Sequence, residues 1–201
     1  DFGQLLDAAD LEVRTVRLLP ARKDLAFAVK DRKLTVTLPQ GLEYGQKQTI
    51  EVAYSVKPKT GMYFFPAKGI RSAQAWNYGE GGLHYGWLPL YNDTNDRFTA
   101  EINVTVAKPF VALSNGVLVS SKKNADGTRT DYWKMDKPHA PYLFMMAVGE
   151  YAVVKDKWRG IPVEYYVEPK FEQYARDIFP YTPEMLEFFS TKLGYAYPWP
   201  K

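Results

Sequence analysis

The chain has 201 residues, of which 46% are hydrophobic and 24% are charged, and this composition is typical of a globular protein and argues against wholesale disorder. Its 26 basic and 23 acidic residues give a formal net charge of +3, and the basic residues do not form the clustered stripe of a nucleic-acid binder. The lack of cysteine excludes disulfides, cysteine zinc ligands and a thiol nucleophile. No apolar run approaches the roughly 20 residues that cross a bilayer. We therefore expect neither a nucleic-acid partner nor a membrane span, and the composition leaves the compartment open.

Alternation of apolar and polar residues predicts strands in the first two thirds of the chain. Such a pattern puts one face of a strand on a core and the other toward water. The alternating segments are residues 11–18, 33–38, 48–56 and 98–106. Residues 124–127 are typical of a hairpin turn between strands at 117–119 and 128–133. The sequence thus predicts a mainly β fold, an antiparallel saddle or sandwich without crossover helices.

The pattern changes near residue 155, after which one more strand is expected at residues 161–167. Beyond Pro169 the apolar period becomes helical over residues 171–179, and Pro180 ends that helix. A second helix is expected from Thr182 as N-cap to a stop at Gly194. Two such helices cannot bury their own apolar stripe. We therefore expect the apolar side chains of residues 171–193 to be poorly covered by this chain.

The sequence offers no self-contained catalytic or zinc-binding group. A helical zinc site needs two histidines at i and i+4, as in H-E-x-x-H, and the two histidines here, His84 and His139, are far apart. Each is expected to be an ordinary hydrogen-bonded histidine. Ser114 precedes Asn115 and Gly116 without the G-x-S-x-G pattern of a nucleophile, so we expect a turn there.

One connection, residues 74–87, combines glycines, large aromatic residues and the carboxylate of Glu80. Glycines allow backbone to approach a ligand closely, and aromatic rings with one acid can hold an organic cation. The alternative is a long loop that packs on its own rings and binds nothing.

This connection also carries a family resemblance. The segments Trp76-Asn77-Tyr78-Gly79-Glu80 and Trp87-Leu88-Pro89-Leu90-Tyr91, followed by Asn95-Asp96-Arg97, resemble the W-T-Q-G-E and W-F-P-C-Y-D-H-P-N-D-K segments of aminopeptidase N-type zinc aminopeptidases, the gluzincins. Further similar segments occur in the same order along nearly the whole chain. They are Asp7-Ala8-Ala9-Asp10-Leu11-Glu12-Val13, Ala112-Leu113-Ser114-Asn115-Gly116, Pro141-Tyr142-Leu143, Ala147-Val148-Gly149-Glu150-Tyr151, and the stretches 182–189 and 194–201.

The resemblance implies a domain organisation and an activity. Residues 1–157 would be the family's N-terminal β saddle domain, without its first strands, and residues 158–201 would open a thermolysin-like α/β catalytic domain. The chain would be a piece of a zinc-dependent aminopeptidase that removes N-terminal residues from peptides. The family's zinc helix would lie beyond Lys201, so this piece alone is expected to bind no zinc and to be inactive. Its partners would be the N-terminus of a peptide substrate and the remainder of the catalytic domain.

The resemblance also implies a substrate-binding role for Glu80 and its neighbour Tyr78. In the family, the position of Glu80 reaches the active site and helps to hold the free α-amine of the substrate. Four neighbouring positions depart from the family pattern: Tyr78 replaces Gln, Tyr85 replaces Arg, Leu90 replaces Cys and Asn92 replaces Asp. These departures leave open a catalytically inactive binding or scaffold member of the same family. A carbohydrate-binding β-sandwich rich in aromatic residues is a further alternative outside the family.

Overall fold

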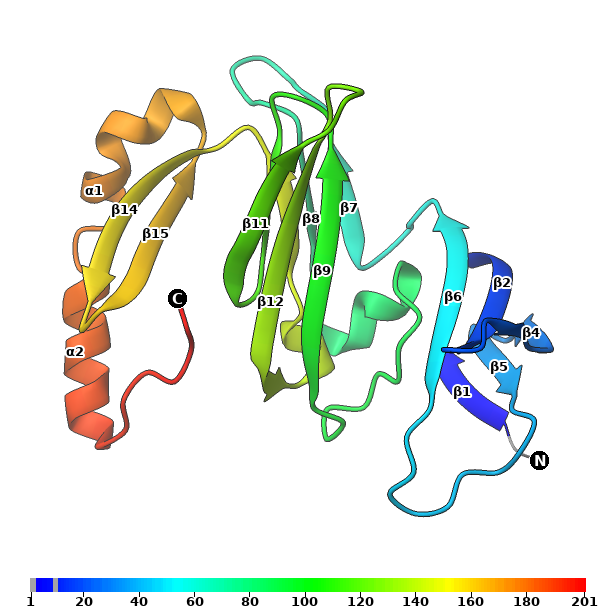
Figure 1. Ribbon diagram of the computed structural model, residues 1–201. Helices are drawn as coiled ribbons and strands as arrows, with labels where there is room; N and C mark the ends of the chain where they lie inside the picture. The colour runs from blue at the N-terminus through cyan, green and yellow to red at the C-terminus, as the bar shows by residue number, and fades with distance from the viewer. Residues whose placement is uncertain (1–2, 9–10) are drawn as a thin grey trace. The chain divides into compact units, whose positions relative to one another are not determined.

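The computed structural model describes residues 3–8 and 11–201, and Ala9 and Asp10 of the first family-like segment lie outside the described residues. The fold is mainly β, with antiparallel sheets and short helices near the C-terminus (Figure 1). This confirms the fold class expected from the sequence. The chain forms two compact units. The first contains the described residues up to Tyr63, with 77–97 and 139–144, and the second contains 64–76, 98–138 and 145–201.

The first unit contains two three-stranded antiparallel sheets. One has the order β1-β5-β4, formed by β1 (Gly3–Asp7), β5 (Lys33–Thr37) and β4 (Phe27–Lys30). The other has the order β3-β2-β6, formed by β3 (Lys23–Asp24), β2 (Leu11–Leu19) and β6 (Thr49–Val56). Apolar residues from the alternating segments meet in one core, which includes Val16, Leu34 and Val36, each at most 1% exposed. The period-two pattern is therefore confirmed as a set of half-buried strands.

The second unit contains two more sheets. A four-stranded sheet has the order β10-β13-β8-β7, formed by β10 (Val111–Ser114), β13 (Met146–Gly149), β8 (Gln74–Asn77) and β7 (Met62–Phe65), and the unit boundary falls within β7 and β8. A three-stranded sheet has the order β11-β12-β9, formed by β11 (Val117–Lys123), β12 (Arg129–His139) and β9 (Phe98–Val106).

Two buried side chains of β12 connect these sheets through β10. The carboxylate of Asp131 accepts a hydrogen bond from the backbone N–H of Ala112, and the indole N–H of Trp133 donates to the carbonyl of Ala112. The Asp131 side chain is fully buried and also pairs with Arg129 at 2.8 Å. A buried carboxylate needs such partners because desolvation without them is costly.

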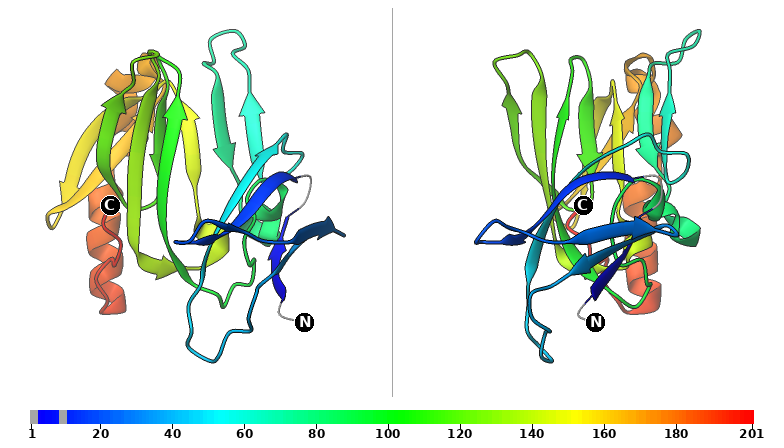
Figure 2. Two further views of the ribbon diagram at one scale, coloured as in Figure 1. Left: turned by 45° about the vertical axis from the view of Figure 1, so that its right-hand side comes forward. Right: turned by 90° about the vertical axis from the view of Figure 1, so that its right-hand side faces the viewer.

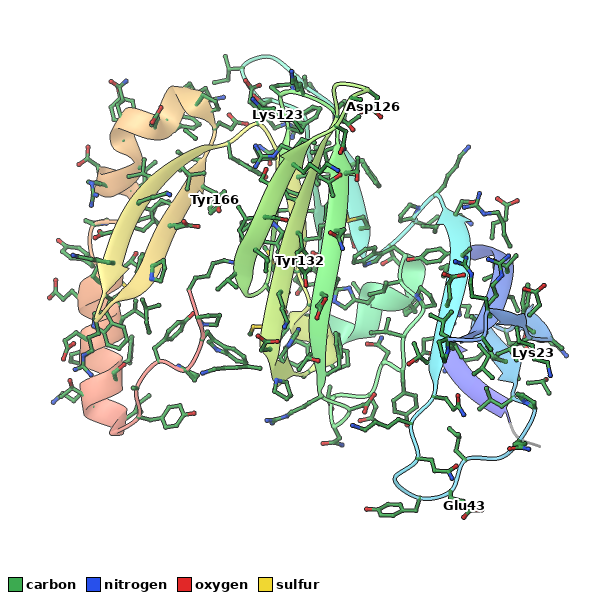
Figure 3. The ribbon with its side chains drawn as sticks, in the orientation of Figure 1. Lys23, Glu43, Lys123, Asp126, Tyr132 and Tyr166 are labelled. Carbon is green, nitrogen blue, oxygen red and sulfur yellow. The ribbon has the colours of Figure 1, made fainter. Side chains whose placement is uncertain are left out.

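The predicted hairpin turn at residues 124–127 is confirmed between β11 and β12 (Figure 3). Asp126 accepts hydrogen bonds from the backbone N–H and the hydroxyl of Thr128 at 2.9 and 2.7 Å. These bonds stabilise the ionised carboxylate and hold the pKa of Asp126 below its usual value.

The C-terminal part begins with an antiparallel hairpin of β14 (Ala152–Trp158) and β15 (Ile161–Val167). Three short helical segments follow: η3 (Pro169–Tyr174), α1 (Ala175–Ile178) and α2 (Thr182–Leu193). Trp158, Val163, Tyr165, Val167 and Ala175 form a core on which Leu186 of α2 packs. Helix α2 lies beside this hairpin in the views of Figures 1 and 2, and it contacts β14.

Two expectations about the helices need correction. The first helix is not continuous from residue 171, because η3 has the tighter 3-10 geometry and only Ala175–Ile178 is α-helical. The second helix begins at Thr182 itself, after Tyr181, and no side chain caps its N-terminus. At the other end Gly194 adopts the left-handed conformation, with φ of 62°, and ends the helix as expected.

The expected exposure of the helical apolar residues is confirmed. Ile178, Phe179, Met185 and Phe189 are 51%, 41%, 55% and 56% exposed, and Leu193 is 73% exposed. Surfaces of this kind are characteristic of interaction sites.

We predict that Phe189→Gln will reduce binding of the hydrophobic dye ANS and leave the free energy of unfolding within about 0.5 kcal/mol of wild type, as for an exposed position. Leu186→Gln on the packed side of the same helix is the control and should cost about 1–3 kcal/mol. Dye fluorescence and urea unfolding measure the two effects. Equal destabilisation by both substitutions would show that Phe189 is buried in solution.

We also predict that Gly116→Ala will destabilise the turn between β10 and β11 by more than about 2 kcal/mol. Gly116 has φ of 78°, and a Cβ atom there would lie 1.9 Å from the carbonyl oxygen of Lys134. Gly127 is the matched control, because it has φ of 84° but open space around a Cβ atom. Gly127→Ala should therefore cost only about 1 kcal/mol, the backbone contribution alone. Equal costs in urea unfolding would refute the steric argument.

Candidate functional site

The connection singled out in the sequence, residues 74–87, is more ordered than a long loop. Its first four residues form β8, and residues Glu80–Gly86 form η1, a 3-10 segment that is interrupted by a kink at Gly81 and Gly82, where φ is 70° and 75°. The segment between them is held by two hydrogen bonds: Asn77 Nδ2 donates to the carbonyl of Phe144 at 2.7 Å, and the N–H of Tyr78 donates to the carbonyl of Gly61 at 2.9 Å. The backbone that leads to Tyr78 and Glu80 is therefore fixed from the β8 side.

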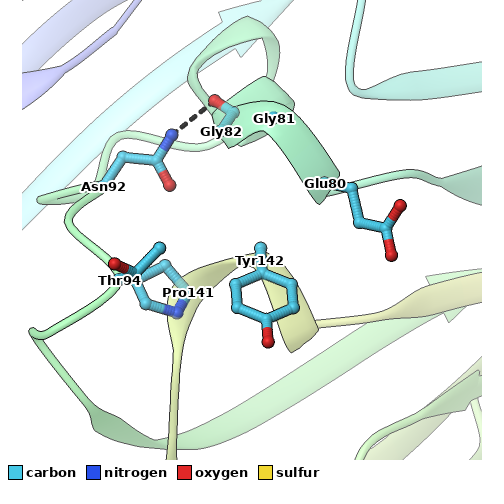
Figure 4. Close-up of a pocket in the computed structure, with 7 residues that line it drawn as sticks. All are labelled: Glu80, Gly81, Gly82, Asn92, Thr94, Pro141 and Tyr142. Carbon is cyan, nitrogen blue, oxygen red and sulfur yellow. Dashed lines mark hydrogen bonds between the residues drawn. The ribbon is translucent and has the colours of Figure 1, made fainter.

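Glu80 lies at a pocket of about 560 Å³ (Figure 4). The lining residues come from η1, from the loop before β9, and from η2 (Pro141–Leu143); they are Glu80, Gly81, Gly82, Asn92, Thr94, Pro141 and Tyr142. In Figure 4 the Tyr142 ring lies between Glu80 on one side and Asn92 and Thr94 on the other. Asn92 donates through its side-chain amide to the carbonyl of Gly82, which ties the loop to η1.

The structure brings the two predicted site residues together. The hydroxyl of Tyr78 donates to Oε2 of Glu80 at 2.5 Å, and both side chains are exposed. The hydrogen bond to the carboxylate raises the pKa of Tyr78, so the phenol remains a neutral donor at neutral pH. The pair is an oriented acceptor for a cation, because one carboxylate oxygen is held by the phenol and the other remains available.

His84 forms the interior of this site. It is fully buried, and its Nδ1 accepts a hydrogen bond from Trp87 Nε1 at 3.1 Å. Its ring lies edge-on to Trp87 and Phe144, which stack on each other with centroids 6.0 Å apart. Burial lowers the pKa of His84, and the carbonyl groups of η2 and Phe144 oppose this effect only in part. His84 is therefore a neutral structural imidazole at neutral pH, and it does not face the pocket.

Sequence reasoning did not identify the rest of the pocket wall. Asn92 was noted only as a departure from the family pattern, and Thr94 and Tyr142 received no site role. They lie 12 to 62 positions from Glu80 along the chain, and only the fold brings them to the pocket. The usable signal was that Asn92 and Tyr142 belong to, or lie beside, the family-like segments.

The described residues do not fit a zinc site. Within residues 3–8 and 11–201 no group of three or more His, Cys, Asp or Glu residues is close enough to hold a metal ion. His84 is enclosed by Trp87 and Phe144, so its nitrogens cannot reach an ion at the surface. No chemical step through zinc follows from this part of the chain.

Comparisons with known proteins show a related fold and a family. A crystal structure of Legionella pneumophila aminopeptidase A in complex with aspartic acid matches 99% of this chain with a TM-score of 0.83, at 18% sequence identity and over 24% of that protein. The Peptidase M1 N-terminal domain matches residues 5–143. The chain belongs to the M1 metallo-aminopeptidase family, as a member that contains its N-terminal domain. The resemblance found in the sequence is thereby confirmed.

Two curated relatives bear different names. Glutamyl aminopeptidase of Bos taurus is 29% identical over 117 residues, which cover 57% of this chain. Transcription initiation factor TFIID subunit 2 of Danio rerio is 24% identical over 149 residues, which cover 71% of this chain. The chain spans only 12% of the length of each relative. Among the described helices, none is long and apolar enough to cross a membrane.

We predict that the 201-residue chain holds no stoichiometric zinc after extensive dialysis, because its two histidines and its acidic residues form no ligand set in the described structure. Elemental analysis of the dialysed protein is the measurement. Zinc at a 1:1 ratio that a chelator removes would contradict the prediction and would require ligands from a different arrangement.

Proposed function

We propose that this chain is part of a zinc-dependent aminopeptidase and supplies the β-domain and the loop that anchors the substrate N-terminus. The observation that carries this proposal is the exposed Glu80 carboxylate, oriented by Tyr78 beside a pocket. Membership of the M1 family supports the reaction class, peptide hydrolysis at the N-terminus. The zinc and the group that activates water would belong to the remainder of the catalytic domain.

Glu80 would bind the α-ammonium of the substrate. An α-amino group has a reference pKa near 8 and is mostly charged at neutral pH, so it forms a charge-assisted hydrogen bond with a carboxylate. The Tyr78 hydroxyl leaves Oε1 of Glu80 without a hydrogen bond from the phenol. Tyr78 and Glu80 would thus select peptides with a free N-terminus, because a peptide whose α-amine is blocked has no positive charge to pair with the carboxylate.

The domain assignment is part of this proposal. Residues 1–157 would form the β saddle domain, and residues 158–201 would begin the thermolysin-like catalytic domain. The exposed apolar side chains of α1 and α2 support the second assignment, because such a face is suited to packing against further catalytic-domain structure.

The second candidate is a catalytically inactive scaffold member of the family. Tyr78 and Tyr85 replace family residues in the site, and one relative over this region is named as a subunit of a transcription initiation factor. An inactive scaffold would have no use for an amine-binding carboxylate. The contribution of Glu80 to aminopeptidase activity therefore distinguishes the two functions.

We predict that Glu80→Ala, in the full-length protein that contains this chain, lowers kcat/KM for a free-amine substrate such as an amino-acid anilide by roughly 10- to 150-fold. This range corresponds to the loss of about 1.5–3 kcal/mol from one charge-assisted pair. An N-acetylated peptide lacks the charge, so it should already be a poor substrate and should lose little more.

Glu43→Ala is a matched control, because Glu43 is an exposed acidic residue in the first unit and is not a pocket residue. It should leave kcat/KM unchanged. If Glu80→Ala lowers only the melting temperature and leaves kcat/KM within twofold of wild type, Glu80 is a loop-stabilising residue and the anchor assignment is wrong. Absence of aminopeptidase activity in the wild-type full-length protein would favour the scaffold function.

A further inference from the structure

Gly79, the residue directly before Glu80, lies against the buried imidazole of His84. A Cβ atom on Gly79 would come within 2.2 Å of His84 Nε2 and 2.4 Å of the carbonyl oxygen of Tyr142. The backbone of residues 78–80, here called the anchor segment, therefore packs directly against the ring of His84 and against η2. A shift of the imidazole toward Gly79 would displace the backbone directly before Glu80.

The two nitrogens of His84 have different environments. Nδ1 accepts from Trp87 Nε1, which fixes Nδ1 as the unprotonated nitrogen, because an indole N–H can only donate. Nε2 carries the proton in the neutral ring, and the carbonyl groups of Phe144, Tyr142 and Pro141 lie near the ring without forming a hydrogen bond of good geometry with Nε2. A fully buried polar atom without such a bond costs stability and requires an explanation.

We propose that His84 is a positioning residue for Glu80, and that its protonation releases the anchor segment and weakens amine binding in mildly acidic solution. This inference rests on the proposed function of Glu80 and names the regulation of the same site. His84 itself does not touch the substrate.

Protonation is incompatible with the packing seen here. A proton on Nδ1 would point at the N–H of Trp87, so the hydrogen bond between the two rings would be lost. The influences on the His84 pKa are burial and the backbone carbonyl groups of Phe144, Tyr142 and Pro141, and no titratable side chain of the described residues is among them. The imidazolium would thus be buried without a counter-ion, and the ring would have to leave its site.

The direction of the pH effect follows from the lowered pKa. Burial lowers the pKa of His84 from 6.5, so below about pH 6.5 the unfolded chain binds the proton more readily than the folded chain. The closed packing around His84 is therefore fully stable above pH 6.5 and loses stability as the pH falls toward the lowered pKa. The ligand amine remains charged throughout this range, since its reference pKa is near 8.

The test is an NMR titration of the 201-residue chain between pH 7.5 and 5. Three signals report on the mechanism: the His84 ring, the Trp87 indole N–H and the Glu80 side-chain carboxyl carbon. We expect an inflection at the His84 titration in all three signals. Leucinamide, a small free-amine probe, should bind roughly tenfold more weakly below that inflection, the loss expected for one charge-assisted hydrogen bond.

His84→Asn provides an oxygen acceptor for Trp87 without a titrating ring, and it should abolish the inflection at Glu80 and the fall in leucinamide affinity. His139→Asn removes the chain's other imidazole and is the matched control, in which both effects should persist. Persistence of the inflection in His84→Asn would overturn the proposal. If that variant does not fold, a wild-type chain in which His84 titrates while the Glu80 and Trp87 signals stay constant would overturn it equally.

The experiment also separates this inference from the proposed function. If Glu80→Gln leaves leucinamide binding unchanged at pH 7.5, Glu80 is not the amine anchor. The shared inflection of the His84, Trp87 and Glu80 signals would still show that His84 positions the segment. Conversely, a Glu80-dependent affinity that does not change with pH would support the anchor and reject the role of His84.

Discussion

The contact between the His84 imidazole and Gly79 is the constraint on which the site depends. Gly79 is the one residue between the two polar side chains, Tyr78 and Glu80, and it can carry no side chain because the imidazole and the Tyr142 carbonyl fill the space. Hydrogen bonds from Asn77 and the Tyr78 backbone fix the same segment from the β8 side. The exposed pair of side chains, Tyr78 and Glu80, whose hydrogen bond is 2.5 Å long, thus lies on a backbone that is held by buried contacts.

The second unit has a comparable fixed point at its C-terminal end. Lys201 donates to the carbonyls of Ser114 and Gly116 at 2.5 and 2.6 Å, and its ammonium lies 4.0 Å from the centroid of the buried Trp133 ring. Burial lowers the pKa of Lys201 to about 8. The carbonyl groups and the aromatic face compensate the ammonium for lost water. The aromatic tail after Gly194 is therefore attached to the β10–β11 turn, although its sequence has no regular pattern.

Fold and function are separate questions in this family. The same region is shared with a protein named as an aminopeptidase and with one named as a transcription factor subunit, at comparable identity. A β scaffold of this kind positions loops but does not by itself determine chemistry. Evidence for activity has to come from a site, and the candidate site in this chain consists of a carboxylate, a phenol and a pocket wall of loop residues.

The sequence by itself determined the strands, because period-two alternation is a local signal that each segment carries alone. Residues 98–106 and 161–167 are strands with the bounds that the pattern indicates, and Gly194 ends its helix where expected. The family-like segments also indicated Glu80 and Tyr78 as candidate substrate-binding residues, a role that remains a prediction. The sequence pattern placed the start of α2 one residue too late, because helix ends are the least certain part of such a pattern. It also predicted α-helix where η3 is a 3-10 helix, because the repeats of the two helix types differ little over one turn. Only the tertiary structure showed that Thr94 and Tyr142 line the pocket and that His84 packs against Gly79. The pocket joins residues that are far apart in the chain, and the packing of His84 depends on the absence of a side chain at Gly79. A local sequence pattern contains neither kind of information.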